Sequence, residues 1–500
     1  MSPPEHTPFS SRAYSQRVLA HLRAPSRVGR LESADAEGTA GSHLCGDLVR
    51  LQLRVKAGVI ADARFQAFGC PATIATASEI VSRLPGLDLL EAARLGHESI
   101  ADHLTLPDHK RGCSEVAADA LHNALEDWVR SAAPVSRPGV ERQATVLVAM
   151  SGGVDSSAAA LLLKEAGLQP AGVTFRLWSD PTCSIGSGCC SPETILRARR
   201  VAHRLDMPHV TVDLRGEFRR TVVEHFVKEY AGARTPNPCV TCNSMLRFSA
   251  LVELADRLGI DKVATGHYAR LLRSPPRLHR ALDPAKDQAY VLAGVAPELL
   301  ERVVFPLGHL EKPRVRELAR KAGLEVHDAE ESQEICFIPD DDYRRFLAER
   351  LGNAPGPIID REGRRLGTHD GAYRFTIGQR KGLGLAAPRP LYVSDIRADG
   401  AIVVGPREDL LVDQVELRDV VRHSTPKNDE GLTVQLRSSG LVVPVSLKEE
   451  GAGVTLRLKA EAAGVARGQA GVVFEGDQVV LAGTIHRTAR VAAQESTRGH

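Results

Sequence analysis

Nine cysteines occur among the 500 residues, and their positions divide them into three groups. This number is too small for a disulfide scaffold, so the sequence predicts thiols, metal ligands or redox centres in a reducing compartment. Isolated structural cysteines rarely cluster in this way, which indicates that the thiols act together. The groups are Cys45, Cys70 and Cys113; Cys183, Cys189 and Cys190; and Cys239, Cys242 and Cys336.

The first group of cysteines is accompanied by a carboxylate. Cys45 and Asp47 stand in LeuCysGlyAsp, while Cys70 and Cys113 each follow a glycine, so all four are expected in turns. Three thiolates and one carboxylate make a complete tetrahedral donor set. The sequence therefore predicts a metal site here, with three structural cysteines as the alternative.

A glycine-containing turn provides a second chemical motif. An apolar run at 146–150 leads into SGGVDSS (151–157), and a helical stretch rich in Ala and Leu follows. Glycines let the backbone approach a ligand closely, and the amides at a helix N-terminus attract phosphate. Because the pattern GxxxxGK[ST] is absent, we expect this loop to hold the pyrophosphate of ATP, with Asp155 binding Mg²⁺. An ordinary serine-capped turn is the alternative.

The third group of cysteines has no decisive spacing of its own. Cys239 and Cys242 follow two prolines in ArgThrProAsnProCysValThrCysAsn (234–243), and Cys336 lies in a short apolar run. A CxxC pattern is compatible with metal binding, with disulfide exchange or with neither, and Cys336 alone could be a buried thiol.

The elements that must position these residues divide the chain into domains. Residues 131–142 contain two prolines and one glycine and predict a linker. Before it, alternating strands around a turn at 56–58 and an amphipathic helix predict an α+β domain over 11–130. After it, short apolar strands at 146–150, 172–177, 209–214 and 262–266 alternate with helices, predicting a buried parallel sheet within 143–341.

The pattern changes again beyond residue 341. Frequent Gly and Pro predict a small α+β or β domain over 342–407, and Val-rich runs between turns predict a β-barrel or sandwich over 408–488. We expect a disordered tail at 489–500. The whole is an α/β-containing multidomain protein.

Charge and hydropathy exclude several classes of protein. Sixty-four basic and 62 acidic residues give a net charge of +2, so any nucleic-acid contact must come from local patches. No apolar run approaches the ~18 residues that span a bilayer, and the N-terminal segment has no apolar signal core. We therefore expect a cytoplasmic protein with no membrane partner.

Several motifs occur together in an order that resembles the tRNA-specific 2-thiouridylase (MnmA) family over about 145–487. SGGVDSS also resembles the signature of the PP-loop ATP pyrophosphatases. The resemblance implies an adenine nucleotide alpha hydrolase-like catalytic domain, a central tRNA-binding domain, and an enzyme that adenylates O2 of the wobble uridine and replaces it with sulfur. The other motifs are ATGHYAR (264–270), LysAspGln (286–288), SQEICFI (332–338), TIGQRKGLG (376–384) and GQAGVVFEGD (468–477).

The same resemblance implies roles for individual residues, with ATP, Mg²⁺ and tRNA as ligands. Cys242 would be the nucleophile, and Cys336 would carry a persulfide sulfur. Adenylation supplies the leaving group that an amide-like carbonyl lacks, so a sulfur nucleophile can then attack. Asn237, Pro238 and Cys239 would meet the target base, Lys286, Asp287 and Gln288 would touch tRNA, and Ala149, Met150, Ser151, Gly152, Gly153, Val154, Asp155, Ser156, Phe175 and Gly266 would line the ATP site.

Cys239 departs from the family pattern, in which many members have Asp at this position. With Cys242 and Cys336 it would complete a three-thiolate set for an iron–sulfur cluster, like that of related thiolation enzymes. Persulfide exchange between Cys242 and Cys336 is the alternative. The group at 183–190 is either a lid with incidental thiols or a sulfur relay.

Residues 11–130 resemble the NifU/IscU-type iron–sulfur scaffold domain, through YSQRVLAHL (14–22), RVGRL (27–31) and ALHNA (120–124). This implies a site for Zn²⁺, for a nascent cluster or for an accepted sulfur at Cys45, Asp47, Cys70 and Cys113. Gly112 replaces the His that often precedes the last cysteine, which favours the zinc-binding, sulfur-accepting subtype. A donor on a linker of about 12 residues would act at millimolar effective concentration. A cysteine desulfurase or another sulfur donor would supply it.

Two other functions compete with a fused tRNA-uridine 2-sulfurtransferase. A PP-loop amide ligase acting on a small substrate would not need Cys242 or Cys336. A non-catalytic iron–sulfur carrier would not need an intact SGGVDS motif. We therefore expect the sulfurtransferase.

Overall fold

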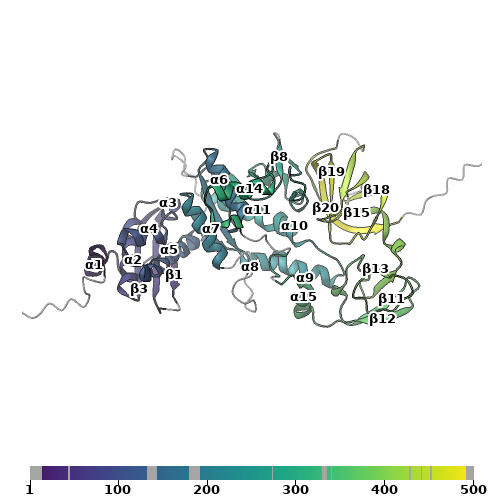
Figure 1. Ribbon diagram of the computed structural model, residues 1–500, viewed down its shortest axis with the longest axis horizontal. Helices are drawn as coiled ribbons and strands as arrows, with labels where there is room; N and C mark the ends of the chain where they lie inside the picture. Colours follow the sequence, from purple (N-terminus) through teal and green to yellow (C-terminus); the bar gives the residue numbers. More distant parts are fainter. Residues whose placement is uncertain are drawn as a thin grey trace, which may run out of the picture.

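The structure is a computed structural model that describes residues 14–42, 45–131, 144–178, 192–272, 274–328, 335–338, 340–426, 430–440, 442–450 and 453–490. Figure 1 shows a helical N-terminal part at one end, a central sheet in the middle, and a barrel and a smaller sheet at the other end. Most of the expected linker and tail, and all of Cys183, Cys189 and Cys190, lie outside the described residues.

The N-terminal part is an antiparallel sheet with helices packed on it. The tight turn after the second strand has Ala57 and Gly58 in the left-handed region, with φ values of 49° and 74°. This hairpin and the long helix that contains Cys113 confirm the predicted α+β arrangement. The strands are β1 (Ala36–Gly41), β2 (Leu48–Lys56) and β3 (Val59–Phe68), and the helices are α1 (Gln16–Arg23), α2 (Pro71–Arg83), α3 (Leu89–Ala92), α4 (His97–Leu104) and α5 (Arg111–Ser131).

The middle of the chain builds a parallel sheet in the order β10-β7-β4-β5-β6. Val148 and its neighbours on one face pack with α6, α7 and α14, whereas Leu147 and Val173 on the other face pack with α11 and α5. The four predicted strands are confirmed, and a short fifth strand joins them at one edge. These elements are β4 (Val146–Ala149), α6 (Val154–Glu165), β5 (Pro170–Arg176), α7 (Pro192–Arg204), β6 (His209–Asp213), α11 (Phe248–Arg257), β7 (Lys262–Thr265), β10 (Val303–Val304) and α14 (Lys312–Lys321).

Shorter helices connect these strands and lead into the next domain. Two of them continue into π-helical turns, η2 and η3, which widen the helix by one residue. They are α8 (Arg215–Phe218), η2 (Arg219–Val223), α9 (Glu224–Ala231), α10 (Pro238–Cys242), η3 (Asn243–Arg247), α12 (Ala289–Leu292), α13 (Pro297–Leu300) and α15 (Tyr343–Leu351).

Two β structures complete the C-terminal part. A four-stranded sheet has the order β12-β11-β14-β13, and a larger sheet closes because its strands β15 and β20 pair with one another. The C-terminal part is therefore a barrel, not a sandwich. Strands β9 (Arg277–His279) and β8 (Arg270–Leu272) extend the barrel sheet from the middle domain. The strands are β11 (Gly356–Ile359), β12 (Arg365–His369), β13 (Tyr392–Ile396), β14 (Ile402–Gly405), β15 (Leu411–Arg422), β16 (Leu432–Gln435), β17 (Val442–Glu450), β18 (Gly453–Ala463), β19 (Ala470–Glu475) and β20 (Gln478–Ala489).

Among the described helices, none is both long enough and apolar enough to cross a membrane.

Candidate functional sites

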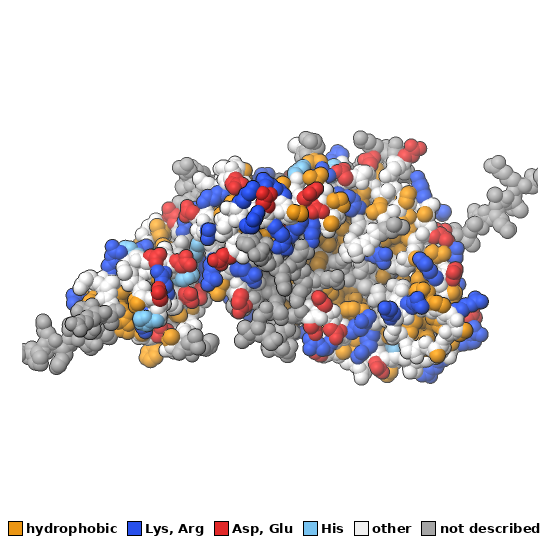
Figure 2. Space-filling view, viewed as in Figure 1, with side chains coloured by type: hydrophobic (Ala, Val, Ile, Leu, Met, Phe, Trp, Pro, Cys, Tyr) orange, Lys and Arg blue, Asp and Glu red, His pale blue; other side chains and the backbone are white. Residues whose placement is uncertain are grey.

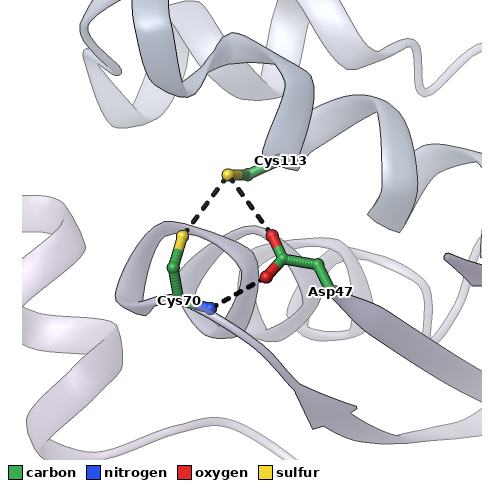
Figure 3. A group of neighbouring side chains, drawn as sticks. All are labelled: Asp47, Cys70 and Cys113. Atoms are coloured by element: carbon green, nitrogen blue, oxygen red, sulfur yellow. Dashed lines mark hydrogen bonds between the residues drawn. The ribbon is translucent and has the colours of Figure 1, made fainter. Parts of the chain in front are cut away.

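Asp47, Cys70 and Cys113 converge in the N-terminal part (Figure 3). The Cys70 and Cys113 sulfur atoms are 3.4 Å apart, and Cys113 Sγ lies 3.7 Å from Asp47 Oδ2. Asp47 precedes β2, Cys70 caps the start of α2, and Cys113 lies in the first turn of α5. Their ligand atoms all lie within 4.8 Å of one another, which is compatible with one metal ion.

Hydrogen bonds hold this donor set in place. Asp47 accepts from the Cys70 backbone N–H at 3.1 Å and from the Thr73 hydroxyl at 2.5 Å. A Cβ added at Gly69 would meet Asp47 Oδ1 at 2.5 Å, so only glycine lets this carboxylate reach the site. The donors are therefore oriented by their surroundings, as metal ligands usually are.

The two buried thiols differ in acidity. Burial raises the pKa of Cys113 to about 12. Burial also acts to raise the pKa of Cys70, but hydrogen bonds from Thr73 and Cys113 outweigh it, so the pKa is lowered overall. The charge of Cys70 in turn raises the pKa of Lys110. Without a metal, these pKa shifts favour a thiolate at Cys70 and a neutral thiol at Cys113. A bound cation such as Zn²⁺ would favour the thiolate form of both cysteines.

Cys45, the fourth predicted ligand, lies outside the group of three. It is exposed in the turn before β2, and its backbone N–H donates to Ser42 Oγ at 3.4 Å. The described site therefore has three converged donors and one predicted ligand on an exposed turn beside them.

The SGGVDSS segment forms a tight turn between β4 and α6. Gly153 is the N-cap of α6, and Ser156 Oγ accepts a hydrogen bond from the Ser151 backbone N–H at 3.1 Å. At Gly152 φ is 73°, and an added Cβ would lie 2.3 Å from the Thr194 carbonyl oxygen. A Cβ at Gly266 would lie 2.6 Å from the Ser156 nitrogen, so the end of β7 abuts the start of the helix. The helix amides thus lie at the carboxyl edge of the sheet, where α/β proteins bind nucleotides.

Asp155 in this turn is paired with a lysine that the sequence analysis missed. Lys312 Nζ lies 2.7 Å from both carboxylate oxygens, and the Tyr268 hydroxyl donates to Oδ1 at 2.8 Å. Lys312 is 9% exposed and stands in the first turn of α14. No local pattern marks it, because 157 residues separate it from Asp155. The structure therefore places a carboxylate at this turn and an ammonium group, from α14, beside it.

Cys239 and Cys242 lie on α10. The Asn237 side chain caps this helix by accepting from the backbone N–H groups of Cys239 at 3.0 Å and Val240 at 3.2 Å, and Pro238 is its first residue. Cys242 is buried, and the π-helical turn η3 follows it. Such turns are frequent at functional sites.

Cys336 comes from a distant segment but packs in the same apolar cluster as Cys242. That cluster also contains Phe218, Phe226 and Phe337. Burial, followed by the charge of Cys242, raises the pKa of Cys239, and Arg247 acts in the opposite direction. Within the described residues, the three sulfur atoms do not all lie within 4.8 Å of one another, unlike the N-terminal donors. The structure thus brings the two predicted reactive thiols into one cluster.

The barrel holds the segment that precedes α10. The Thr235 backbone N–H donates to the Arg467 carbonyl at 2.7 Å, and the Thr235 carbonyl accepts from Gln469 Nε2 at 2.9 Å. Gly468, at φ 90°, would place an added Cβ only 3.0 Å from Thr235 N. The barrel turn therefore fixes the start of the Cys239–Cys242 segment.

Two of the predicted tRNA-contacting residues bind their own domain. The Asp287 side chain is 8% exposed and accepts from Arg280 Nη1 at 2.8 Å and from the Ala281 nitrogen at 2.9 Å. Gln288 Oε1 accepts from the Tyr268 nitrogen at 2.9 Å, beside the phosphate loop. Lys286 and Phe175 are partly exposed.

Comparison with known proteins decides the family. Four family models match: a NifU-like N terminal domain at 13–133, a tRNA methyl transferase HUP domain at 144–340, a tRNA methyl transferase PRC-barrel domain at 344–406 and an aminomethyltransferase beta-barrel domain at 412–485. A bifunctional protein NifU/MnmA of Rubrobacter xylanophilus is 44% identical over 486 residues, which are 95% of this chain and 99% of that protein. The chain belongs to the bifunctional NifU/MnmA family.

Relatives with the MnmA name alone match a smaller part of this NifU/MnmA protein. The tRNA-specific 2-thiouridylases MnmA of Geobacter metallireducens and Acidothermus cellulolyticus are 43% and 44% identical, over 68% and 69% of this chain and 96% and 99% of their own lengths. Both resemblances found in the sequence are therefore confirmed.

Proposed function

We propose that this NifU/MnmA protein is an ATP-dependent tRNA-uridine 2-sulfurtransferase with a fused sulfur or iron–sulfur donor domain. The observation that carries the proposal is the phosphate loop at Asp155 in the same domain as Cys242 and Cys336, which share one apolar cluster. Activation by adenylation and attack by sulfur need both features. The similarity to tRNA-specific 2-thiouridylases MnmA agrees with it.

The residues favour sulfur transfer over the other chemistries considered. Two of the matching family models are described as methyl transferase domains, but methyl transfer gives no reason for two clustered thiols in the same domain as a pyrophosphate loop. An amide ligase would likewise leave Cys242 and Cys336 without a role. A non-catalytic carrier would leave the loop without one.

Adenylation begins with ATP at the start of α6. The amides of Gly152, Gly153 and the first helical turn face the phosphates, and Lys312 offsets their negative charge. Asp155 would hold Mg²⁺, which when bound shields the phosphate oxygens. Asp155 and Lys312 contact one another, so one nucleotide with its Mg²⁺ could contact both groups. The uridine O2 then attacks the α-phosphate, and pyrophosphate leaves.

Sulfur transfer uses the two clustered thiols. The terminal sulfur of a Cys336 persulfide attacks C2 of the adenylated uridine, and the C2–O bond breaks to release AMP. The Cys242 thiolate then attacks Cys336 Sγ, which breaks the S–S bond, leaves sulfur on C2 and forms a Cys242–Cys336 disulfide. A dithiol reductant restores the two thiols. A cysteine desulfurase is the proposed source of the persulfide sulfur.

The substrate would approach over surfaces that carry local basic residues. Figure 2 shows Lys and Arg side chains gathered over the middle and the lower C-terminal part of the face drawn. The helices α14 (KPRVRELARK) and α15 (YRRFLAERL) supply basic side chains. Local patches of this kind suit the phosphate backbone of tRNA, although the net charge is only +2.

The N-terminal donor set fits Zn²⁺ or a nascent iron–sulfur cluster. Asp47, Cys70 and Cys113 would hold either one through one carboxylate and two thiolates, with Cys45 as the proposed fourth ligand. Zn²⁺ and an iron–sulfur cluster are the alternatives at this site. A cluster at Cys239, Cys242 and Cys336 is the alternative to persulfide exchange. Metal analysis after anaerobic purification would distinguish them.

ATP–pyrophosphate exchange, measured with and without unmodified tRNA, tests the proposal. We expect exchange that depends on tRNA, and 2-thiouridine in digests of the tRNA once sulfide is added. Exchange that needs only a small amide-forming substrate would indicate a ligase. A complete lack of exchange would indicate a carrier.

A further inference from the structure

Helix α5 of the NifU-like domain packs against elements of both that domain and the catalytic domain. Its first turn carries Cys113 of the metal-like site, and its later turns lie against β6 and α7 of the catalytic domain. Figure 1 shows α5 beside α7, between the N-terminal sheet and the central one. The contacts along this helix determine whether the NifU-like domain can move.

Glu126 makes the most buried polar contact between the domains. Its side chain is 8% exposed, pairs with Arg176 and accepts from the Asp213 backbone N–H at 2.7 Å. Arg176 and Asp213 end strands β5 and β6. One carboxylate of α5 thus joins two strand ends at the catalytic edge of the sheet. Breaking one partner of such a buried pair leaves an uncompensated charge, which is strongly unfavourable.

Three further polar contacts lie along the same junction. Asp119 pairs with Arg199 of α7 at 2.5 Å. Arg257 of α11 donates to the carbonyls of Val129 at 2.9 Å and Arg130 at 2.7 Å, which satisfies the end of α5. Arg94, which follows α3, donates to the Asp206 carbonyl at 2.5 Å.

Apolar packing and buried histidines fill the space between these contacts. One continuous core contains Leu125 of α5, Val210 of β6 and Leu251 of α11. His122 and His203 face one another across the junction, with ring centroids 6.3 Å apart. Interfaces between independently moving domains are usually more polar and do not share a core.

We infer that the NifU-like domain is docked in a fixed position on the catalytic domain, with Glu126 and Asp119 setting the register, and is not a mobile donor on a linker. Glu126 is thirteen residues after Cys113, so at about 1.5 Å per residue the Cys113 thiol lies about 20 Å along α5 from the Glu126 contact. The sequence predicted a donor tethered by a linker of about 12 residues. A docked domain would stay close to the catalytic domain without relying on that tether.

A fixed donor has a consequence for sulfur, which rests on the proposed function. Movement of the domain then cannot bring sulfur held at Cys70 or Cys113 to the Cys242–Cys336 cluster. The linker then contributes little to transfer, because the docked surface already holds the two domains together.

The test uses the full chain with a protease site placed within 132–143, cut after folding. We expect the two pieces to co-elute as one species near the 53.9 kDa of the intact chain, at low salt and at about 0.5 M salt, where surface ion pairs are screened. Separation of the cut wild-type pieces would overturn the docking, whatever the enzyme's activity.

A matched pair of variants tests the assigned residues. Glu126→Ala combined with Asp119→Ala should release the pieces after cutting, with at least a tenfold weaker association. Asp127→Ala should not, because Asp127 accepts from the Glu37 nitrogen at 2.9 Å within the NifU-like domain itself. Equal behaviour of the two variants would remove Glu126 and Asp119 from this role.

The cut protein also tests the sulfur consequence. With a cysteine desulfurase as donor, cut and uncut protein should thiolate tRNA at rates within about twofold of one another. A large loss on cutting, with the pieces still associated, would show that the linker acts as a tether. The co-elution result separates this failure from a failure of the proposed function.

Discussion

The two thiol sites of this protein are assembled in opposite ways. Asp47, Cys70 and Cys113 come from three elements, and their ligand atoms already lie within 4.8 Å in a polar, hydrogen-bonded setting. Cys242 and Cys336 instead pack in an apolar cluster that contains Phe218, Phe226 and Phe337. A site for a metal profits from fixed donors, whereas thiols that exchange sulfur must change partners during each turnover.

The largest effect should come from the clustered thiols. Cys242→Ser and Cys336→Ser should each lower thiolation by on the order of 10³ or more, since each removes a bond-forming sulfur. The double variant should be no worse than either single one. ATP–pyrophosphate exchange should persist in all three variants, and retained 2-thiouridine in one of them would remove that cysteine from the mechanism.

Substitution in the phosphate loop should stop the reaction one step earlier. Asp155→Ala and Lys312→Met should each reduce AMP formation by about 10²–10³, because each loses a group aimed at phosphate or its cation. Lys321→Met is the control, since Lys321 lies on the same helix but pairs with exposed Glu317 at 2.6 Å. If Lys312→Met leaves the exchange rate unchanged, Lys312 only supports the fold.

Substitution of different ligands should weaken metal binding at the N-terminal site to different extents. Asp47→Ala should weaken Zn²⁺ binding by about 10–100-fold or more, as measured by chelator competition. Cys45→Ser should weaken it less, because Cys45 is exposed outside the converged group. An equal loss for the two variants would instead identify Cys45 as a full ligand.

The junction between the domains should be sensitive to acid. Burial lowers the pKa of His203 to about 4 and lowers the pKa of His122 and His209 well below the ordinary value. Below about pH 6.5 these histidines therefore bind more protons in the unfolded chain than in the folded protein. The free energy of unfolding decreases as the pH falls from about 6.5 towards 4. We expect Tm to fall by a few degrees over this range. His122→Phe should flatten the pH dependence, and an unchanged slope would exclude His122 as a contributor.

The smallest effect should come from Cys239→Asp, which restores the commoner residue of the family. If Cys242 and Cys336 act as a pair, thiolation should stay within about tenfold of the parent rate. A cluster held by all three cysteines predicts another result: loss of visible absorption in the anaerobic protein and a fall in thiolation by orders of magnitude.

Local patterns predicted those parts of the fold that local physics determines. The strand at 146–150 and the glycine turn after it follow from a short apolar run and from residues that tolerate positive φ. Cys45, Asp47, Cys70 and Cys113 were predicted together because each stands at a turn. The structure brings the last three together and leaves Cys45 exposed on a turn beside them, and a turn pattern alone does not specify which side chains converge.

Contacts between distant segments were not predictable from the same patterns. Lys312 looks like the start of an ordinary basic helix, and only the tertiary structure brings it to Asp155. The sequence predicted the segment of α5 only as an amphipathic helix of the N-terminal domain. Its buried residues, including Glu126 and Trp128, occupy more of its circumference than one sheet could cover, and the second surface belongs to the catalytic domain.

The hydrogen bonds between Thr235 and the barrel connect movements of the barrel to helix α10. Both the N–H and the carbonyl of Thr235 are bound to the turn at 467–469, two residues before the Asn237 cap of α10. The barrel and helix α10 are thus connected through two hydrogen bonds to a single residue. We expect a displacement of the barrel turn to shift the start of the helix that carries Cys239 and Cys242.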